Sequence, residues 1–156
     1  MELKGIVSMI TGAGSGIGRA TSITFAREGA KIIVVDVDKV AGKQTVNMIT
    51  EQGGEAFYHQ ADISKAEQVE NAVDKAIKKW GSIDNLINNA GIMSMNRLID
   101  TPEQEWDRVL DVNLKGVFLC MKYVIPHMIE RKNGTIVNIS SANGLVGAEN
   151  IRLRSV

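Results

Sequence analysis

The chain has 156 residues, 44% of them hydrophobic and 23% charged, and its formal net charge is zero. This length predicts one globular domain over residues 1–156, and the zero net charge gives no electrostatic reason to expect a nucleic acid or a membrane as partner. The single cysteine, Cys120, excludes an intramolecular disulfide and a cysteine-rich metal site, so no metal is expected, and the lack of a signal-peptide pattern predicts a cytoplasmic protein.

The first predicted unit covers residues 4–36. An apolar run predicts a strand that leads into a glycine-rich turn at Thr11–Gly18, and a helical pattern follows the turn. A second apolar run then ends at Asp36, eighteen residues after Gly18. Strand, glycine turn, helix and strand in this order form the βαβ pattern of dinucleotide-binding proteins.

Glycine suits this turn for physical reasons. A tight turn between a strand and a helix favours positive φ, which costs little only at glycine. Without Cβ atoms the backbone can approach a pyrophosphate, and the free N–H groups at the start of the helix attract its negative charge. A carboxylate at the end of the second strand can accept hydrogen bonds from a ribose diol. The pattern therefore predicts nucleotide binding.

Two other kinds of ligand-binding loop are also rich in glycine. A P-loop requires Gly-Lys followed by Ser or Thr, whereas Gly42-Lys43 is followed by Gln44, so this reading fails. A methyltransferase that uses S-adenosylmethionine also carries a GxGxG turn and an acidic residue after its second strand. That alternative stays open at this point.

Alternation of helices and strands continues along the chain. The pattern predicts a helix over about 38–52, a third strand over 55–61, and a helix that Ser64 caps and Gly81 ends. A fourth strand over 83–88 is followed by a helix that starts near Pro102, a longer helix over about 112–131 and a fifth strand over 135–141. This order predicts an α/β fold with a doubly wound parallel sheet of about five strands, a Rossmann fold.

Four motifs in this order resemble the short-chain dehydrogenase/reductase family, in the branch with a TGxxxGxG turn. They are the glycine turn, Asp62, the sequence Asn88–Gly91 and the strand end that carries Ser140 and Ser141; Asn113 in the long helix is a fifth match. The resemblance extends from Gly5 to about Ile151, with matches at Gly144 and Gly147. It implies that the Rossmann fold is incomplete at its C-terminal side.

The resemblance implies that the cofactor is NAD. Asp36 would hold the adenosine ribose and repel the 2′-phosphate of NADP, with no Arg or Lys at position 13 or 37 to offset the repulsion. Asp62 would meet the adenine, Ile63 would pack on its ring, and Asn88 would line the nicotinamide ribose with its neighbours. The cofactor-binding residues expected from the family are Thr11, Gly12, Ser15, Gly16, Ile17, Gly18, Asp36, Asp62, Ile63, Asn89, Ala90 and Gly91.

Two further residues are expected to be catalytic by the same resemblance. Ser141 would donate a hydrogen bond to the substrate oxygen, and Asn113 would bend its helix and hold a water molecule in a proton relay. The family implies hydride transfer between the nicotinamide and a secondary alcohol or ketone, so a small-molecule substrate is expected.

The resemblance ends at the family's acid and base, a Tyr with a Lys four residues later. The Tyr would lie thirteen residues after Ser141, where this chain has Arg154, and neither Tyr58 nor Tyr123 is followed by Lys at that spacing. We therefore expect the chain to be inactive by itself, because hydride transfer needs a proton donor. The alternative is a non-catalytic dinucleotide-binding module.

Self-association is also expected from the sequence. A fifth strand at the edge of the sheet would leave unpaired backbone groups, and the long helix would expose an apolar stripe that includes Val117, Met121 and Val124.

Overall fold

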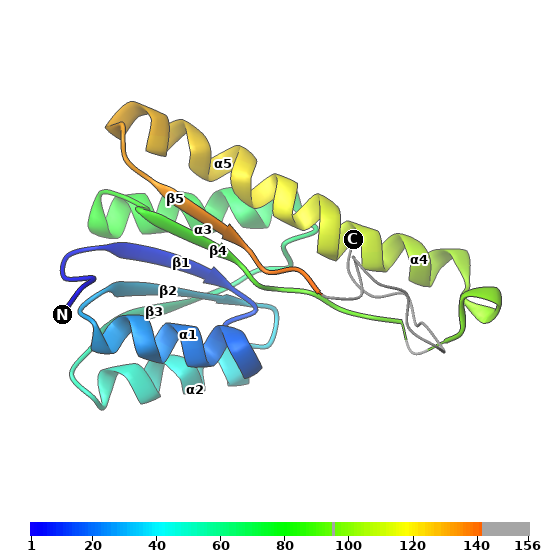
Figure 1. Ribbon diagram of the computed structural model, residues 1–156, viewed down its shortest axis with the longest axis horizontal. Helices are drawn as coiled ribbons and strands as arrows, with labels where there is room; N and C mark the ends of the chain where they lie inside the picture. Colours follow the sequence, from blue (N-terminus) through cyan, green and yellow to red (C-terminus); the bar gives the residue numbers. More distant parts are fainter. Residues whose placement is uncertain (95, 142–156) are drawn as a thin grey trace.

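Five parallel strands form one sheet in the computed structural model, which describes residues 1–94 and 96–141 (Figure 1). The strands lie in the order β3-β2-β1-β4-β5, and every neighbouring pair is parallel. Their bounds are β1 Val7–Thr11, β2 Lys31–Asp36, β3 Glu55–Gln60, β4 Asn85–Asn88 and β5 Thr135–Asn138. The predicted parallel sheet is confirmed, although its last strand ends three residues earlier than predicted. The predicted matches at Gly144 and Gly147, the end of the resemblance near Ile151 and the mismatch at Arg154 lie outside the described residues.

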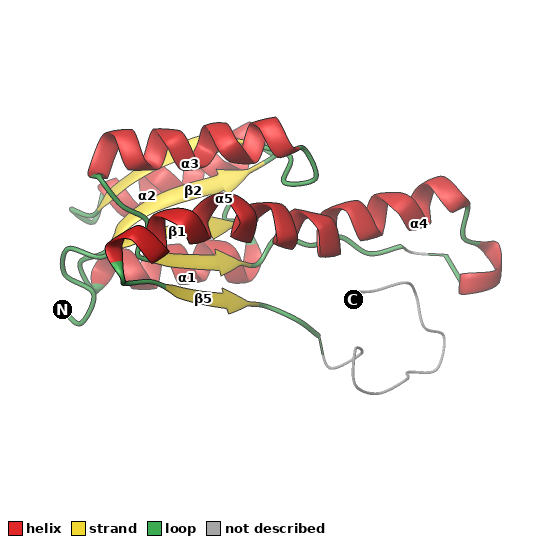
Figure 2. Cartoon of the chain, turned by 90° about the horizontal axis from the view of Figure 1, so that it is seen from above, coloured by secondary structure: helices red, strands yellow, loops and turns green. Residues whose placement is uncertain are grey.

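Helices cover both faces of the sheet (Figure 2). Helices α1 (Gly16–Arg27) and α2 (Lys39–Thr50) pack on one face, and α3 (Ala66–Trp80) and α5 (Gly116–Arg131) on the other. Successive residues of β2 enter these two cores in turn: Ile32 and Val34 face α1 and α2, whereas Ile33 and Val35 face α3 and α5. This double burial explains why the strand sequence is an unbroken apolar run.

The start of α3 differs from the prediction. The helix begins at Ala66 after Lys65, and no side chain caps it. Ser64 instead donates both its hydroxyl and its backbone N–H to Oδ1 of Asp62, at 2.7 and 3.0 Å. An Asp that bonds the residue two positions later forms a local turn, and this turn takes the hydroxyl away from the helix. The end of the helix is as predicted, since Gly81 has a φ of 80°.

The two helices predicted after Pro102 form one continuous helical run. A short 3₁₀ turn, η1 (Leu98–Asp100), comes first, and α4 (Glu103–Leu110) joins α5 through a π-helical turn, η2 (Asp111–Lys115). Asn113 lies at the centre of η2. A π turn holds one residue more than an α-helical turn, and such turns recur at functional sites.

The apolar stripe that α5 leaves exposed is not the predicted one. Val124 is fully buried against the sheet, and Val117 and Met121 are half-buried. The large apolar side chains exposed along η2 and α5 are Leu114 at 52%, Phe118 at 55%, Ile125 at 36% and Ile129 at 69%. We call these four residues the α5 stripe. In the described part of the chain, no helix combines the length and the apolarity that crossing a membrane requires.

Candidate functional site

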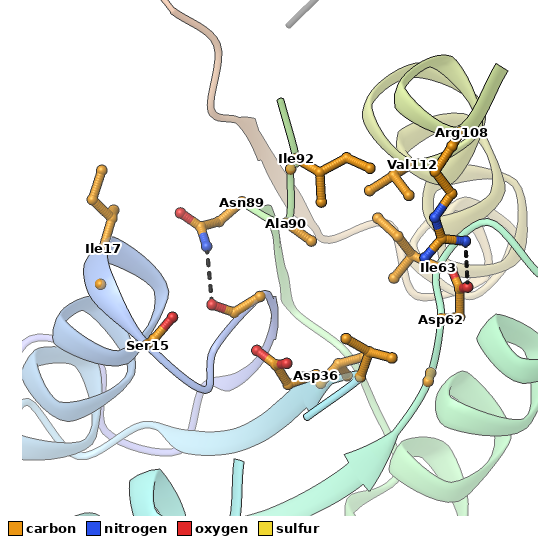
Figure 3. Close-up of a pocket in the computed structure, with 16 residues that line it drawn as sticks. Ser15, Ile17, Asp36, Asp62, Ile63, Asn89, Ala90, Ile92, Arg108 and Val112 are labelled. Atoms are coloured by element: carbon orange, nitrogen blue, oxygen red, sulfur yellow. Dashed lines mark hydrogen bonds and ion pairs between the residues drawn. The ribbon is translucent and has the colours of Figure 1, made fainter. Parts of the chain in front are cut away.

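A cavity of about 360 Å³ lies at the carboxyl ends of the strands, where ligands bind in sheets of this kind (Figure 3). Ten of the predicted cofactor-binding residues line it, with six further residues that the family resemblance did not name. The lining residues are Gly12, Ser15, Gly16, Ile17, Val35, Asp36, Val37, Ala61, Asp62, Ile63, Asn89, Ala90, Gly91, Ile92, Arg108 and Val112. The segments that follow four different strands thus meet at one cavity.

The glycine turn forms one wall of the cavity. Gly12 has a φ of 62°, and a Cβ there would lie 2.8 Å from the Cα of Ala90. A Cβ at Gly18 would overlap the carbonyl oxygen of Gly12 and lie 2.6 Å from Nδ2 of Asn89. Gly18 is buried and does not line the cavity, so it acts by letting the helix start close beneath the turn.

The N-terminus of α1 points its first residues at the cavity. Ser15, Gly16 and Ile17 line it, no side-chain hydrogen bond caps the helix, and no acidic residue occupies its first turn. The free N–H groups and the positive end of the helix dipole can therefore receive an anion such as a pyrophosphate.

The Asp36 carboxylate is fixed at the end of β2. Its Oδ2 accepts a hydrogen bond from the N–H of Gly14 at 2.7 Å, and its Oδ1 accepts one from the N–H of Asp38 at 2.9 Å. An ionised carboxylate offers about four acceptor positions, so two remain for hydroxyl donors in the cavity. This geometry suits a ribose diol.

Asp62 and Arg108 lie together at the other end of the cavity from Ser15 and Ile17 (Figure 3). Nη1 of Arg108 lies 3.0 Å from Oδ2 of Asp62. Burial raises the pKa of Asp62, but the hydrogen bonds from Ser64 and the charge of Arg108 outweigh burial and hold this pKa below its usual value. Asp62 is therefore ionised at neutral pH. Arg108 is not identifiable from the sequence, because its partner lies 46 positions away and no local pattern marks the pair.

Thr11 and Asn89 tie the glycine turn to the end of β4. The Thr11 hydroxyl accepts from the N–H groups of Asn89 and Ala90 at 3.0 and 3.1 Å and donates to the carbonyl of Ile87 at 3.4 Å. The Asn89 amide donates to the carbonyls of Thr11 and Gly12 at 3.0 and 3.3 Å. Thr11 is fully buried and does not line the cavity. It supports the wall rather than presenting a group to a ligand.

Asn88, which the resemblance placed at the nicotinamide ribose, is buried and is not among the residues that line the cavity. Its Nδ2 donates to Oδ1 of Asn138 at 2.8 Å, so it joins β4 to β5. Asn88 and Asn138 lie opposite each other in the β4–β5 register, so this bond between their side chains reinforces the pairing of the two strands.

The two residues expected to be catalytic do not line the cavity. Asn113 is half-buried, and its amide forms two hydrogen bonds with the backbone of Ile92: Nδ2 donates to the carbonyl at 2.8 Å and Oδ1 accepts from the N–H at 2.9 Å. Since Ile92 lines the cavity, Asn113 holds part of its wall. Ser141 is half-buried and follows β5 at the same edge of the sheet.

Neither Tyr58 nor Tyr123 is among the residues that line the cavity. Tyr58 donates its hydroxyl to the carbonyl of Asp36 at 3.0 Å, and burial together with the charges of Asp36 and Asp38 raises its pKa. Tyr123 is half-buried on α5. A tyrosine with a raised pKa gives up its proton less readily, so Tyr58 is poorly suited to proton transfer at neutral pH.

Other titratable side chains belong to the core. Burial raises the pKa of the Cys120 thiol to about 12, so this thiol stays protonated at neutral pH. Burial and the charge of Lys75 lower the pKa of His59, although a hydrogen bond with Gln68 acts in the other direction. Within residues 1–94 and 96–141, no cluster of three His, Cys, Asp or Glu side chains could hold a metal ion.

Comparison with known proteins identifies the family. The profile of the short chain dehydrogenase family matches residues 6–153. Two proteins of Thermotoga maritima are similar in sequence: an uncharacterized oxidoreductase, 43% identical over 148 residues, and a 3-oxoacyl-(acyl-carrier-protein) reductase, 42% identical over 147 residues. Each alignment covers 94% of this chain, and 58% and 60% of the respective relative.

The fold is also shared with solved structures. That of NAD⁺-bound xylitol dehydrogenase superimposes with a TM-score of 0.92 at 35% identity, over 96% of this chain and 58% of the other. The chain therefore spans about three fifths of the length of the relatives it matches. Because the family profile covers nearly all of its residues, the chain belongs to the short-chain dehydrogenase family of oxidoreductases.

Proposed function

We propose that the chain binds NAD(H) in the cavity at the strand ends and that its protein is an oxidoreductase of secondary alcohols and ketones. The Asp36 carboxylate is the observation that carries the choice of NAD, because two backbone N–H groups hold it with acceptor positions left over. It can accept hydrogen bonds from both hydroxyls of an unmodified ribose.

The residues around the cavity fit such a cofactor. The uncapped N-terminus of α1 suits the pyrophosphate, and the close approach of Gly12 to Ala90 leaves no room for a Cβ on the turn. Ile63 and Val112 offer apolar surface beside Asp62 for a flat base. When bound, the cofactor supplies or accepts the hydride.

Charge favours NAD over NADP in this proposal. Asp36 would repel a 2′-phosphate, and Arg108, the one cation among the described residues that line the cavity, is engaged with Asp62. Within the described part of the cavity lining, a phosphate would thus meet a carboxylate without a free cation beside it.

Calorimetric titration with NADH and NADPH tests the proposal. We expect NADH to bind more tightly than NADPH by about tenfold or more. The repulsion between one close pair of like charges near the surface is enough to weaken binding by that factor. Asp36→Ala and Asp36→Asn should bring the dissociation constants for NADH and NADPH closer together. Asp74→Ala, which removes an exposed carboxylate on α3, should leave the ratio of these constants unchanged. Equal or tighter binding of NADPH by the unmodified chain would refute the choice of NAD.

We further propose that residues 1–156 bind the cofactor without catalysing hydride transfer by themselves. Neither Tyr58 nor Tyr123 lines the cavity, and neither is followed four residues later by Lys. This favours the dinucleotide-binding module as the activity of the isolated chain. We expect no change in NADH absorbance above background with a panel of sugars, polyols and hydroxysteroids. Turnover that Ser141→Ala abolishes would show that another group supplies the proton.

A further inference from the structure

Arg108 connects two parts of the chain at one end of the cavity. It projects from α4 to Asp62, which follows β3, and the contact between Nη1 and Oδ2 is 3.0 Å long (Figure 3). The Asp62 side chain is only 18% exposed, whereas that of Arg108 is 50% exposed. The more buried member of the pair is therefore the carboxylate, and Arg108 shields it from the solvent side.

The hydrogen bonds of Asp62 can be counted by oxygen. Oδ1 accepts two, from the N–H and the hydroxyl of Ser64. Oδ2 accepts one, from Arg108. A carboxylate oxygen accepts about two hydrogen bonds, so a single acceptor position remains, on Oδ2. Since Asp62 lines the cavity, this position is where a donor on a ligand can bind.

The surroundings of this acceptor suit a flat heterocycle. Ile63 and Val112 line the cavity beside Asp62, and both are nearly fully buried. A base that packs against these apolar side chains can direct an amino group at its edge toward Oδ2. An oxygen at the same place on the base would meet a carboxylate that it cannot hydrogen-bond.

We propose that Arg108 is a positioning residue that makes the cavity selective for a 6-aminopurine over a 6-oxopurine. It holds the Asp62 carboxylate in one orientation and occupies one acceptor position of Oδ2, so the other accepts from the exocyclic amine. This inference rests on the proposed binding of NAD(H), and it specifies which residue enforces recognition of the base. Arg108 acts through Asp62 and does not itself contact the amine.

The test compares NADH with its hypoxanthine analogue, in which an oxygen replaces the exocyclic amine. Both are titrated by calorimetry into the unmodified chain, Arg108→Leu and Arg108→Lys. We expect the unmodified chain to prefer NADH by about tenfold, the range of one hydrogen bond to a charged group. Arg108→Leu should reduce this preference to about threefold or less, and Arg108→Lys should restore part of it.

Two controls separate positioning from a general loss of structure. Arg27→Leu removes an arginine that bonds Gln52 on the surface, and it should leave the preference unchanged. In an Asp62→Ala background, Arg108→Leu should have no further effect on the preference. If Arg108→Leu lowered the preference for NADH equally with and without the Asp62 carboxylate, the positioning role would be overturned. Arg108 would then contact the base directly.

The outcomes also distinguish this inference from the proposed function. If the unmodified chain binds NADH but its preference survives Arg108→Leu, only the role of Arg108 is overturned. If the unmodified chain binds neither NADH nor the analogue, the proposed function is overturned, and the role of Arg108 with it.

Discussion

Thr11 shows how a buried side chain shapes a cavity that it does not line. Its hydroxyl accepts two hydrogen bonds from the backbone after β4 and donates one to Ile87, which uses its full capacity. Valine would fit the same volume but would leave the half-buried N–H groups of Asn89 and Ala90 without their acceptor. The hydroxyl thus fixes the separation between the glycine turn and the segment that carries Asn89.

Gly18 provides a prediction at the scale of one atom. Gly18→Ala places a Cβ against the carbonyl of Gly12 and the amide of Asn89, so the turn must move. We expect a loss of about 1–3 kcal/mol in the free energy of unfolding, the range of overpacking in a protein interior, and loss of NADH binding. Urea unfolding and calorimetric titration measure the two effects.

Gly53→Ala is the matched control for that substitution. Gly53 has a φ of 81° but has no atom within 4 Å of the position of a Cβ. Its replacement should cost about 1 kcal/mol through backbone strain alone and leave NADH binding intact. If both variants lose the same stability and retain binding, the close approach at Gly18 does not shape the site.

Some site residues could be predicted from local spacing and others could not. Asp36 is identifiable because a strand period and a glycine turn fix its place in one βαβ unit. Arg108 is not, since its partner is 46 positions away and a polar residue on a short helix carries no mark of an ion pair. Asn88 was assigned to the cavity by family resemblance, but its side chain belongs to the sheet.

At the scale of elements, the π turn η2 explains how one helical run serves two purposes. Before η2 in the chain, α4 presents Arg108 to the cavity. After η2, α5 buries Leu119 and Val124 against the sheet. The additional residue in the π turn changes the direction in which the following side chains point. Apolar periodicity alone does not reveal such a turn, which is why the sequence predicted two separate helices with a boundary near residue 112.

Asn113 ties this turn to the loop after β4, and its removal gives a prediction for the element. Asn113→Ala loses both hydrogen bonds to Ile92, so we expect a loss of about 1–3 kcal/mol in the free energy of unfolding. The exchange of the Ile92 amide hydrogen should accelerate. Asn113→Asp can still accept from the Ile92 N–H but cannot donate to the Ile92 carbonyl. Its free energy of unfolding should therefore also fall below that of the unmodified chain.

Asn71→Ala is the matched control for this helix position. Asn71 is exposed on α3, and replacing it by a better helix former should be neutral or slightly stabilising. Equal unfolding midpoints for Asn113→Ala and Asn71→Ala would contradict the role of Asn113 in holding the loop.

For the whole molecule, two surfaces of the described chain lead us to predict self-association. β5 lies at one end of the strand order, and its Val137 is 41% exposed. The α5 stripe adds four large apolar side chains on one helical run. Strand edges and apolar stripes of this kind pair readily with a second copy.

We predict a concentration-dependent dimer built on the α5 stripe. Burial of a large side chain such as Phe118 contributes about 1.5–3 kcal/mol, so a few of them offset much of the cost of association. Sedimentation velocity over a range of concentrations should show the dimer, and Phe118→Lys should shift it to monomer. Val40→Lys, at a 68% exposed site on α2, should not. A monomer at every concentration would count against the prediction.

The strand order has a consequence for folding during synthesis. β1 stands in the middle of the sheet, yet its two neighbours are made at very different times: Val7 pairs with Lys31, whereas Ser8 pairs with Asn85. The first three strands can associate while the chain is still short, with one edge of β1 left open. Contacts of long sequence separation form slowly, and the bond between Thr11 and Asn89 spans 78 positions. The wall that completes the cavity is thus among the last parts to assemble, so we expect the complete cavity to form only after β4 has joined β1.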